Sequence, residues 1–438
     1  MTSPSNDWEH ALGIWRSAVE AVRPEPLVET AIAALPEVRS APRILVVGAG
    51  KAGPGMALGL EKALASQLDR VEGLLNVPAG MSAPLQRVRL HAARPQGVNE
   101  PRPEGVAGTE EMLRLLESAR PEDVAVCLLS GGGSALLPAP AIGITLADKL
   151  AITKQLHRSG ATIDEMNCVR KHLSRVKGGR LAEAFRGKRL VSLIVSDVVG
   201  DPLDVIASGP TAPDPTTFAD ACAVLDRYGL RSTTPEDVVR HLECGRDGAI
   251  PETPKAIPAN VSNRVIGSNR VALDVARRTA EGLGYRVLDL GAFVEGETRQ
   301  IATAIAGVVR SIRSDAVPVA PPACILIGGE TTVTLGQNPG KGGRNQEFVL
   351  AMLAKLGRGG LSGVTVLSGG TDGEDGPTDA AGAIADLGIL TEMERAGCSA
   401  EEYLGRHDAY PCFEKAGGLL KTGLTGTNVM DVRVILVR

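Results

Sequence analysis

Three glycine-rich loops of the sequence have compositions that suit anion binding. The first, residues 48–53, reads Gly-Ala-Gly-Lys-Ala-Gly between a predicted strand and a predicted helix. Its spacing fits the dinucleotide-binding fingerprint, in which glycines let the backbone approach a pyrophosphate. A tight strand–helix turn would use the same glycines. Lys51 adds a cation at a helix N-terminus, so we take Gly48, Gly50 and Lys51 as candidate anion-binding residues.

A nicotinamide cofactor requires an acidic residue that the sequence does not place correctly. That residue is expected at the end of the second strand, about twenty positions after the glycines. Glu72 has the spacing, but it opens the predicted strand, whose far end reads Asn76-Val77-Pro78. The first loop therefore favours a phosphate group over a nicotinamide dinucleotide.

The second loop follows the apolar run 124–129. Successive backbone N–H groups of such a loop can form a nest for an anion. The loop lacks the last glycine of a nucleophile elbow, so its second serine is not expected to be a nucleophile. The candidate residues for a carboxylate or phosphate are Ser130, Gly131, Gly132, Gly133 and Ser134.

The third loop begins at residue 336 and leads into an apolar helix. It differs from a P-loop because three residues separate its first two glycines and its lysine precedes a glycine. Two cations beside a helix N-terminus nevertheless favour phosphate. The candidates are Lys341, Gly342, Gly343, Arg344 and Asn345.

Carboxylates follow two of the predicted strands. Asp197 ends the apolar run 190–196, and Asp372 and Asp375 follow the run 364–367. Such oxygens are hard ligands that suit Mg²⁺, although ordinary acidic turns would have the same composition. Together with the glycine loops they form the combination that phosphoryl transfer needs, cations on the phosphates and a metal that bridges them.

A basic run over residues 167–180 allows two interpretations. It contains Arg170, Lys171, Lys177 and Arg180, and the pair Gly178-Gly179 interrupts it. Such charges commonly form a solvated helix face. They could equally belong to a functional site, and the sequence leaves both interpretations open.

Short apolar runs alternate with longer amphipathic segments, which is typical of βαβ units. The predicted strands are 43–47, 72–77, 124–129, 190–196, 264–266, 285–290, 323–328, 364–367 and 432–437. The predicted helices are 53–69, 104–118, 146–159, 269–282, 298–314 and 345–356.

These elements predict an α/β protein of two domains. Residues 1–250 should form a Rossmann-like domain with a mainly parallel sheet, and residues 261–438 a smaller α/β domain. The proline-containing segment 245–260 is the predicted linker, and 314–322 a surface loop. We expect the active site in the cleft between the domains. Whether the final strand returns to the first domain stays open.

Composition excludes several classes of partner. The chain of 438 residues has a formal charge of −4, 3% aromatic residues and no Lys/Arg-rich block, so nucleic acid is not expected to bind. It has no apolar run of membrane-spanning length and no signal-peptide pattern at its start. Seven scattered cysteines indicate reduced thiols in the cytoplasm. A monomer and a homo-oligomer both remain open.

Seven ordered segments resemble the glycerate 2-kinase family, some of whose members are labelled hydroxypyruvate reductases. They read GAGKAG, SGGGSALL, NCVRKHLSRVKGGRLA, SDVVGDPLDVIASGPT, GGETTVTL, GKGGRNQEF and SGGTDGEDGPTDAAGA. The resemblance implies ATP- and Mg²⁺-dependent phosphorylation of D-glycerate at its 2-hydroxyl, giving 2-phosphoglycerate. It also implies two α/β domains around the active site. The family's lysine and arginine of that cleft fall on Lys51 and Arg344.

One segment departs from the family pattern. Many members carry a His-Pro…Pro-Asp segment after the third strand, where this chain reads Ala93-Arg94-Pro95-Gln96 and then Asn99-Glu100-Pro101. The difference could mark a subgroup with another substrate preference, so the hydroxy acid itself is left open.

The resulting mechanism has two rivals. In the hypothesis, residues 130–134 hold the glycerate carboxylate with help from Lys51, which with Arg344 neutralises the phosphoryl group. Asp197 activates the hydroxyl or holds Mg²⁺, and Asp372 and Asp375 are further metal candidates. The first rival is an NAD(P)H-dependent reductase of hydroxypyruvate or tartronate semialdehyde. The second is a non-catalytic sensor of a sugar acid or nucleotide.

Overall fold

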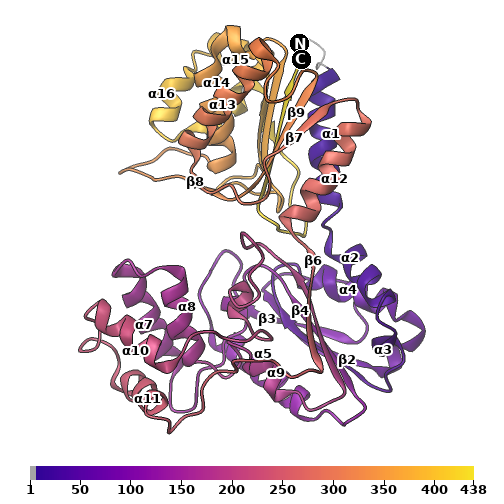
Figure 1. Cartoon of the computed structure of the whole chain (residues 1–438), viewed down its shortest axis with the longest axis vertical. Helices are drawn as coiled ribbons and strands as arrows, with labels where there is room; N and C mark the ends of the chain where they lie inside the picture. Colours follow the sequence, from indigo (N-terminus) through magenta and orange to yellow (C-terminus); the bar gives the residue numbers. More distant parts are fainter. Residues whose placement is uncertain (1–5) are drawn as a thin grey trace. The chain divides into compact units, whose positions relative to one another are not determined.

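The computed structural model describes residues 6–438, and these divide into two compact units (Figure 1). Residues 24–266 form the first-sheet unit, and residues 6–23 with 267–438 form the second-sheet unit. Each unit contains a six-stranded sheet with helices packed on it. The predicted α/β class is therefore confirmed.

The first sheet has the strand order β3-β2-β1-β4-β5-β6, the Rossmann order. Its first five strands pair in parallel. The central strands are continuous runs of buried apolar residues, as expected where helices cover both faces of a sheet. The strands are β1 (Ile44–Ala49), β2 (Val71–Pro78), β3 (Val88–Arg94), β4 (Val124–Leu129), β5 (Arg189–Val195) and β6 (Val261–Gly267).

Helices α2, α3 and α4 cover one face of this sheet, and α5 with α9 covers the other (Figure 1). Helices α7, α8, α10 and α11 pack into a separate cluster. The helices are α2 (Pro24–Ala33), α3 (Pro36–Arg39), α4 (Gly53–Ala63), α5 (Pro103–Glu117), α6 (Gly133–Leu136), α7 (Leu146–Arg158), α8 (Ile163–His172), α9 (Arg180–Ala184), α10 (Phe218–Arg227) and α11 (Glu236–Arg246), with 3-10 turns at Ala65–Arg70 and Ile206–Ser208.

The second sheet has the order β13-β12-β11-β14-β9-β7 and is mixed. The final strand lies at its centre, antiparallel to both neighbours, so it does not return to the first sheet. The strands are β7 (Arg286–Asp289), β9 (Ala323–Gly329), β11 (Val364–Gly370), β12 (Gly382–Ala385), β13 (Leu419–Leu420) and β14 (Asp431–Val437), with a separate pair, β8 (Gly296–Glu297) and β10 (Thr331–Thr332).

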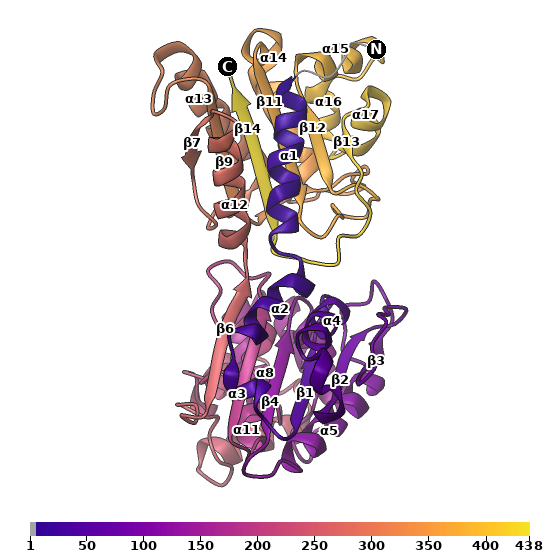
Figure 2. The same ribbon diagram turned by 90° about the vertical axis from the view of Figure 1, so that its right-hand side faces the viewer.

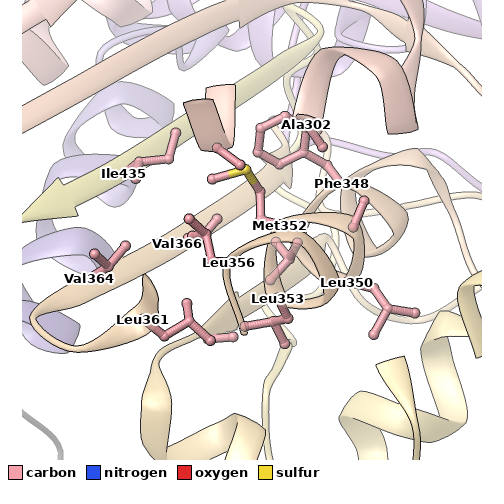
Figure 3. Close-up of a cluster of buried hydrophobic side chains, with 14 of the residues drawn as sticks. Ala302, Phe348, Leu350, Met352, Leu353, Leu356, Leu361, Val364, Val366 and Ile435 are labelled. Atoms are coloured by element: carbon pink, nitrogen blue, oxygen red, sulfur yellow. The ribbon is translucent and has the colours of Figure 1, made fainter. Parts of the chain in front are cut away.

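Helices α1 and α12 lie side by side on one face of the second sheet (Figure 2). Helices α13 and α14 cover the other face, with α15, α16 and α17 packed around α14. Phe348 and Met352 of α14 pack there against Val366 and Ile435 of the sheet (Figure 3). The helices are α1 (Asn6–Glu20), α12 (Asn269–Gly282), α13 (Thr298–Asp315), α14 (Arg344–Leu361), α15 (Leu387–Arg395), α16 (Ala400–Gly405) and α17 (Ala409–Ala416).

The division of the chain differs from the predicted boundaries 1–250 and 261–438. Helix α1 belongs to the second-sheet unit, where Trp15 Nε1 donates to the Gly369 carbonyl at 3.3 Å. The predicted linker 245–260 lies within the first-sheet unit, because the Pro254 carbonyl accepts the Asp214 N–H at 2.8 Å and β6 follows. The prolines of this segment therefore shape a packed loop, and the chain passes between units at 23–24 and 266–267.

All seven cysteines are unpaired thiols, and all but Cys244 are buried. Among residues 6–438, no helix has the length and apolar composition needed to cross a bilayer.

Candidate active site

The first and second glycine loops lie side by side, because they follow the neighbouring strands β1 and β4. The order of the sheet reverses between these strands, which is where ligands bind in open α/β sheets. The Lys51 N–H donates to the Gly131 carbonyl at 2.9 Å, and the Ala52 N–H donates to Ser130 Oγ at 3.0 Å. The structure thus joins two of the predicted anion-binding loops into one wall.

The glycines of the first loop have a structural cause. Gly48 and Gly50 have φ angles of 149° and 151°, a region that favours glycine. A Cβ at Gly48 would lie 1.9 Å from the Leu128 carbonyl oxygen, and one at Gly50 would lie 2.0 Å from Ser130 Oγ. Both glycines therefore make room for β4 and its loop. Lys51 is exposed, and its side chain makes no hydrogen bond or ion pair with the described residues.

The end of β2 where a nicotinamide cofactor would need an acidic residue carries Asn76, and Glu72 lies near the other end. Glu72, near the strand's start, pairs with Arg43 at 2.8 Å. At the other end Asn76 is fully buried, and its Nδ2 donates to the carbonyls of Leu136 and Gly105 at 2.7 and 3.1 Å. The position where a ribose would need a carboxylate therefore contains a buried structural amide.

The second loop forms part of a cavity of about 530 Å³ inside the first-sheet unit. Side chains from α7, α8 and the segments after β4 and β5 line it. The polar ones are Asn99, Glu100, Ser130, Ser134, Lys149, Thr153, Lys154, Asn167, Arg170, Lys177, Asp197 and Ser208. Two cations of the basic run 167–180, Arg170 and Lys177, thus line a cavity, whereas Lys171 pairs with the buried Asp214 at 3.2 Å. The run is therefore not a solvated helix face, and a role of the first two cations in a site is a proposal.

Arg170 and Lys177 converge on Ser134. Arg170 Nη2 donates to Ser134 Oγ at 2.5 Å, and Lys177 Nζ donates to Ser134 Oγ and the Ser134 carbonyl at 2.9 Å. Burial lowers the pKa of both cations, and the charges of Arg170 and Lys149 lower that of Lys177 further. Ser134 therefore orients the cations, which agrees with its exclusion as a nucleophile.

Asp197 reaches the same cavity from the end of β5. It is half-buried, and a Cβ at Gly131 would lie 2.4 Å from its Oδ2. Gly131 is therefore needed for the approach of this carboxylate. The predicted nest is only partly available, because the Gly133 N–H already donates to the Ser130 carbonyl at 3.1 Å.

Lys149 is a cavity residue that the sequence did not single out. It is 8% exposed, and its Nζ has no hydrogen-bond partner in the part of the chain that the structure describes. Burial, followed by the charge of Arg170, lowers its pKa to about 7. Its spacing with the buried Ile152 and Leu156 on α7 was the available signal, since i, i+3 and i+7 share a helix face.

The depressed pKa predicts a pH-dependent stability. An unfolded lysine titrates near 10.4, so above pH 7 the unfolded chain binds more protons and stability rises with pH. Between pH 7 and 9 the gain from Lys149 should be about 2 kcal/mol. Denaturant unfolding of wild type and Lys149→Met at both pH values measures it, since the variant lacks this gain. The other charged cavity groups are common to both proteins: Arg170, Lys177, Asp197, Lys154 and Glu100. Parallel pH profiles would contradict the assignment.

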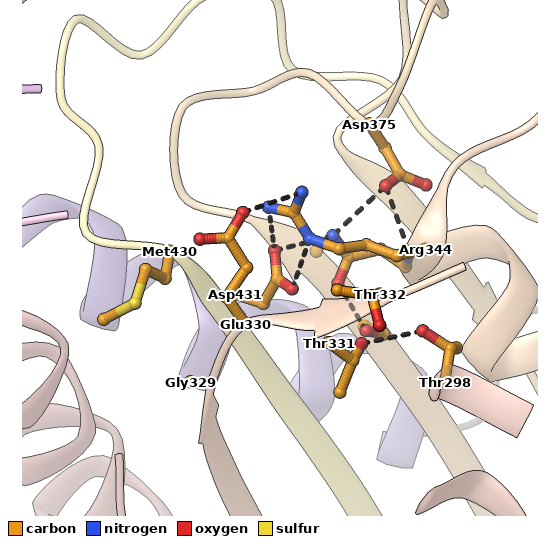
Figure 4. Close-up of polar contacts among 12 residues, drawn as sticks. Thr298, Gly329, Glu330, Thr331, Thr332, Arg344, Asp375, Met430 and Asp431 are labelled. Carbon is orange, nitrogen blue, oxygen red and sulfur yellow. Dashed lines mark hydrogen bonds and ion pairs between the residues drawn. The ribbon is translucent and has the colours of Figure 1, made fainter. Parts of the chain in front are cut away.

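Arg344, the first residue of α14, lies in the second-sheet unit and is held by carboxylates (Figure 4). Its Nε and Nη2 donate to Asp431 at 2.7 and 2.9 Å, and its Nη1 pairs with Glu330 at 3.0 Å. Burial opposes the charged guanidinium, but Asp431 raises its pKa above the usual value. Asp431, fully buried, also pairs with Arg433 at 3.1 Å.

The N-terminus of α14, predicted to bind phosphate, is capped by Asp375. The Asp375 carboxylate accepts the N–H groups of Asn345 and Gln346 at 3.0 and 2.9 Å. Burial raises the pKa of Asp375 to about 6. A Cβ at Gly343 would lie 2.2 Å from the Asp375 Cγ, so the glycine makes room for this cap. Both oxygens of Asp375 thus accept backbone hydrogen bonds, so the structure gives this carboxylate a role as the cap of α14.

Lys341, Asn345 and Asp372 also have local partners. Lys341 Nζ lies 3.6 Å from the centre of the Tyr410 ring, and Asn345 Nδ2 donates to Asp431 at 2.8 Å. Asp372 accepts the Glu374 N–H at 3.1 Å. Within residues 6–438, no group of three or more His, Cys, Asp or Glu side chains is arranged to hold a metal.

Comparisons with known proteins cover both units. Residues 10–243 match the family described as "Domain of unknown function (DUF4147)", and residues 323–431 match the MOFRL family. A glycerate 2-kinase of Pyrococcus horikoshii is 40% identical, over 90% of this chain and 87% of that protein. An Agrobacterium vitis protein with a provisional hydroxypyruvate reductase name is 43% identical, over 92% of this chain and 89% of that protein.

The fold agrees with these sequence matches. The crystal structure of a glycerate kinase from Thermotoga maritima superposes with a TM-score of 0.90, at 36% identity, and covers 99% of this chain and 100% of that one. The chain therefore belongs to the glycerate kinase family.

Proposed function

We propose that the protein is a glycerate 2-kinase, which transfers the γ-phosphate of ATP to the 2-hydroxyl of D-glycerate. Membership of the family makes the chain a kinase of glycerate, and a kinase implies a nucleotide substrate. The observation that carries the proposal is the contact between the first two glycine loops, at the point where the strand order of the first sheet reverses. Lys51 belongs to the first of these loops, and the second loop lines a cavity together with several cations and Asp197. We expect a cytoplasmic enzyme that acts on small molecules only.

The proposed step is an in-line displacement at phosphorus. The 2-hydroxyl oxygen forms a bond to the γ-phosphorus while the bond to the bridging oxygen of ADP breaks. Asp197 accepts the hydroxyl proton, as a carboxylate at the cavity wall can do. Lys51 and Arg344 neutralise the charge of the transferring group. Arg344 can take part although Asp431 and Glu330 hold it, because a guanidinium has more N–H donors than those contacts use.

Magnesium is proposed as the metal that neutralises the nucleotide phosphates when bound. Asp372 fits a single carboxylate contact to it, because the residue is half-buried at the end of β11. Asp197 is the other candidate if it does not act on the hydroxyl. Asp375 does not enter this proposal, since it caps α14.

The segment that departs from the family pattern lies at the proposed acceptor site. Asn99, Glu100 and Pro101 line the cavity with the second loop. They are therefore our candidates for residues that select among hydroxy acids. A panel of hydroxy acids assayed as acceptors would show which one the cavity prefers.

The activity is tested with purified protein, D-glycerate, ATP and Mg²⁺. We expect release of ADP that depends on glycerate and formation of 2-phosphoglycerate, detected directly by coupling to enolase. NADH with hydroxypyruvate is assayed in parallel, because the Agrobacterium relative bears a reductase name. Oxidation of NADH without release of ADP would replace the kinase by the reductase. Binding of glycerate with neither reaction would support a sensor.

A further inference from the structure

Three cations that line the cavity, Lys149, Arg170 and Lys177, carry positive charge that their hydrogen-bond acceptors do not neutralise. Lys149 Nζ is buried without a hydrogen-bond partner among the described residues. Lys177 Nζ donates to Ser134 and, at 3.3 Å, to Ser208 Oγ, and Arg170 Nη1 donates to Asn167 Oδ1 at 3.4 Å. These acceptors are neutral. Arg170 and Lys177 therefore contact neutral groups that orient them and leave their charge uncompensated, and Lys149 Nζ contacts no such group.

Buried like charges destabilise one another unless a counter-ion is present. Two carboxylates line the cavity, Glu100 and Asp197, and neither is among the hydrogen-bond acceptors of Arg170 and Lys177 described above. Glu100 pairs with Lys154 at 3.1 Å, where both side chains are substantially exposed. Asp197 enters over Gly131, on the side of the second loop. A bound anion is thus the expected partner of these three cations.

We infer that Lys149, with Arg170 and Lys177, binds the carboxylate of the hydroxy-acid substrate, and that Lys149 makes the enzyme select an acid over a neutral alcohol. The inference rests on the proposed function and assigns the carboxylate to side chains that the sequence-based mechanism did not use. A carboxylate suits the cavity better than a nucleotide phosphate does. Asp197 in the same wall would repel phosphate oxygens, whereas it can accept a hydrogen bond from a substrate hydroxyl.

The binding role is tested with Lys149→Met, which keeps most of the length of the side chain and removes its charge. Loss of a hydrogen bond between charged groups should raise the KM for D-glycerate about 10- to 100-fold, with the KM for ATP unchanged. The melting temperature should stay equal or rise, because an unpaired buried cation is removed. Weaker binding in a protein that is no less stable separates a binding role from a structural one.

Arg158→Met is the matched control. Arg158 lies in the last turn of the same helix, and its exposed side chain does not line the cavity. The same loss of charge there should change the KM for glycerate less than about threefold, since an exposed charge outside the cavity contributes little. Equal effects of both variants would overturn the inference, as would a raised KM for ATP with that for glycerate unchanged.

Calorimetric titration without nucleotide keeps the inference testable if the kinase assay fails. Wild type should bind D-glycerate and should not bind glycerol at the same concentration, and Lys149→Met should lose glycerate binding. That result supports the carboxylate site even where no ADP is released, so the proposed function would fail alone. Unchanged glycerate binding in the variant, or no binding in wild type, overturns the inference.

Discussion

Lys51→Met should lower kcat for glycerate phosphorylation about 100- to 1,000-fold, because one preorganised charge on a transition state has that magnitude. The thermal unfolding transition should not move. Lys51 is exposed, and its backbone N–H, which the substitution keeps, makes the contact to Gly131. The two KM values should change little if the cation acts on the transition state alone.

The control for this variant is Lys62→Met. Lys62 lies on α4, the helix that follows the first loop, and pairs with Glu25. Its loss removes the same charge from the same part of the chain, and kcat should stay close to the wild-type value. A Lys51→Met enzyme with near-normal turnover would show that Lys51 is not catalytic.

Asp431→Asn should reduce the free energy of unfolding by about 3–5 kcal/mol, the cost of breaking a buried ion pair by removal of one partner. The carboxylate is fully buried, and Arg344 and Arg433 both depend on it, as does Asn345. Burial by itself would raise the pKa of Asp431, but the two guanidinium groups lower it. The asparagine keeps the shape of the side chain and removes the charge that both arginines need.

Urea unfolding of Asp431→Asn beside Asp379→Asn measures this effect. Asp379 is exposed and pairs with Lys421 at 2.9 Å, so its loss should change stability far less. Comparable midpoints for the two variants would show that the Arg344–Asp431–Arg433 network is not a stabilising element. Activity of the Asp431 variant should also fall, because Arg344 loses the partner that fixes its direction.

The apolar strands were predictable from the sequence, and several helices were not. Strands such as Val124–Leu129 are buried on both faces of the sheet, so all their residues are apolar and the run can be recognised in the sequence. Helices α7, α8 and α10 each begin at a threonine that forms a capping box with an acidic residue three positions on. That signal was present for α8 and α10, which periodicity alone did not identify. The attachment of α1 to the second sheet has no local signature, because it depends on a surface formed hundreds of residues later.

The candidate site divides in the same way. The first two glycine loops and Asp197 could be located because they follow buried strands, and the structure brings these three together within the first-sheet unit. The spacing of Lys149 with Ile152 and Leu156 indicates the buried face of α7, but the groups that surround Lys149 there depend on how this helix packs. Asp375 was predicted as a metal candidate from its place in an acidic loop. The sequence does not show that its carboxylate contacts the N-terminus of α14, because that contact forms only in the folded protein. Local sequence shows that a side chain can bind an ion, but it does not show which group the side chain contacts in the folded protein.

The position of β14 also has a consequence for synthesis of the chain on the ribosome. The first-sheet unit is complete once residue 266 has emerged, whereas the second sheet receives its central strand from residues 431–437. Until then β11 and β9 have no strand between them, and α1, made first, has no finished surface to cover. The first-sheet unit can therefore fold early, as domains generally do. Helix α1 can therefore pack on the second sheet only after β14 has been made.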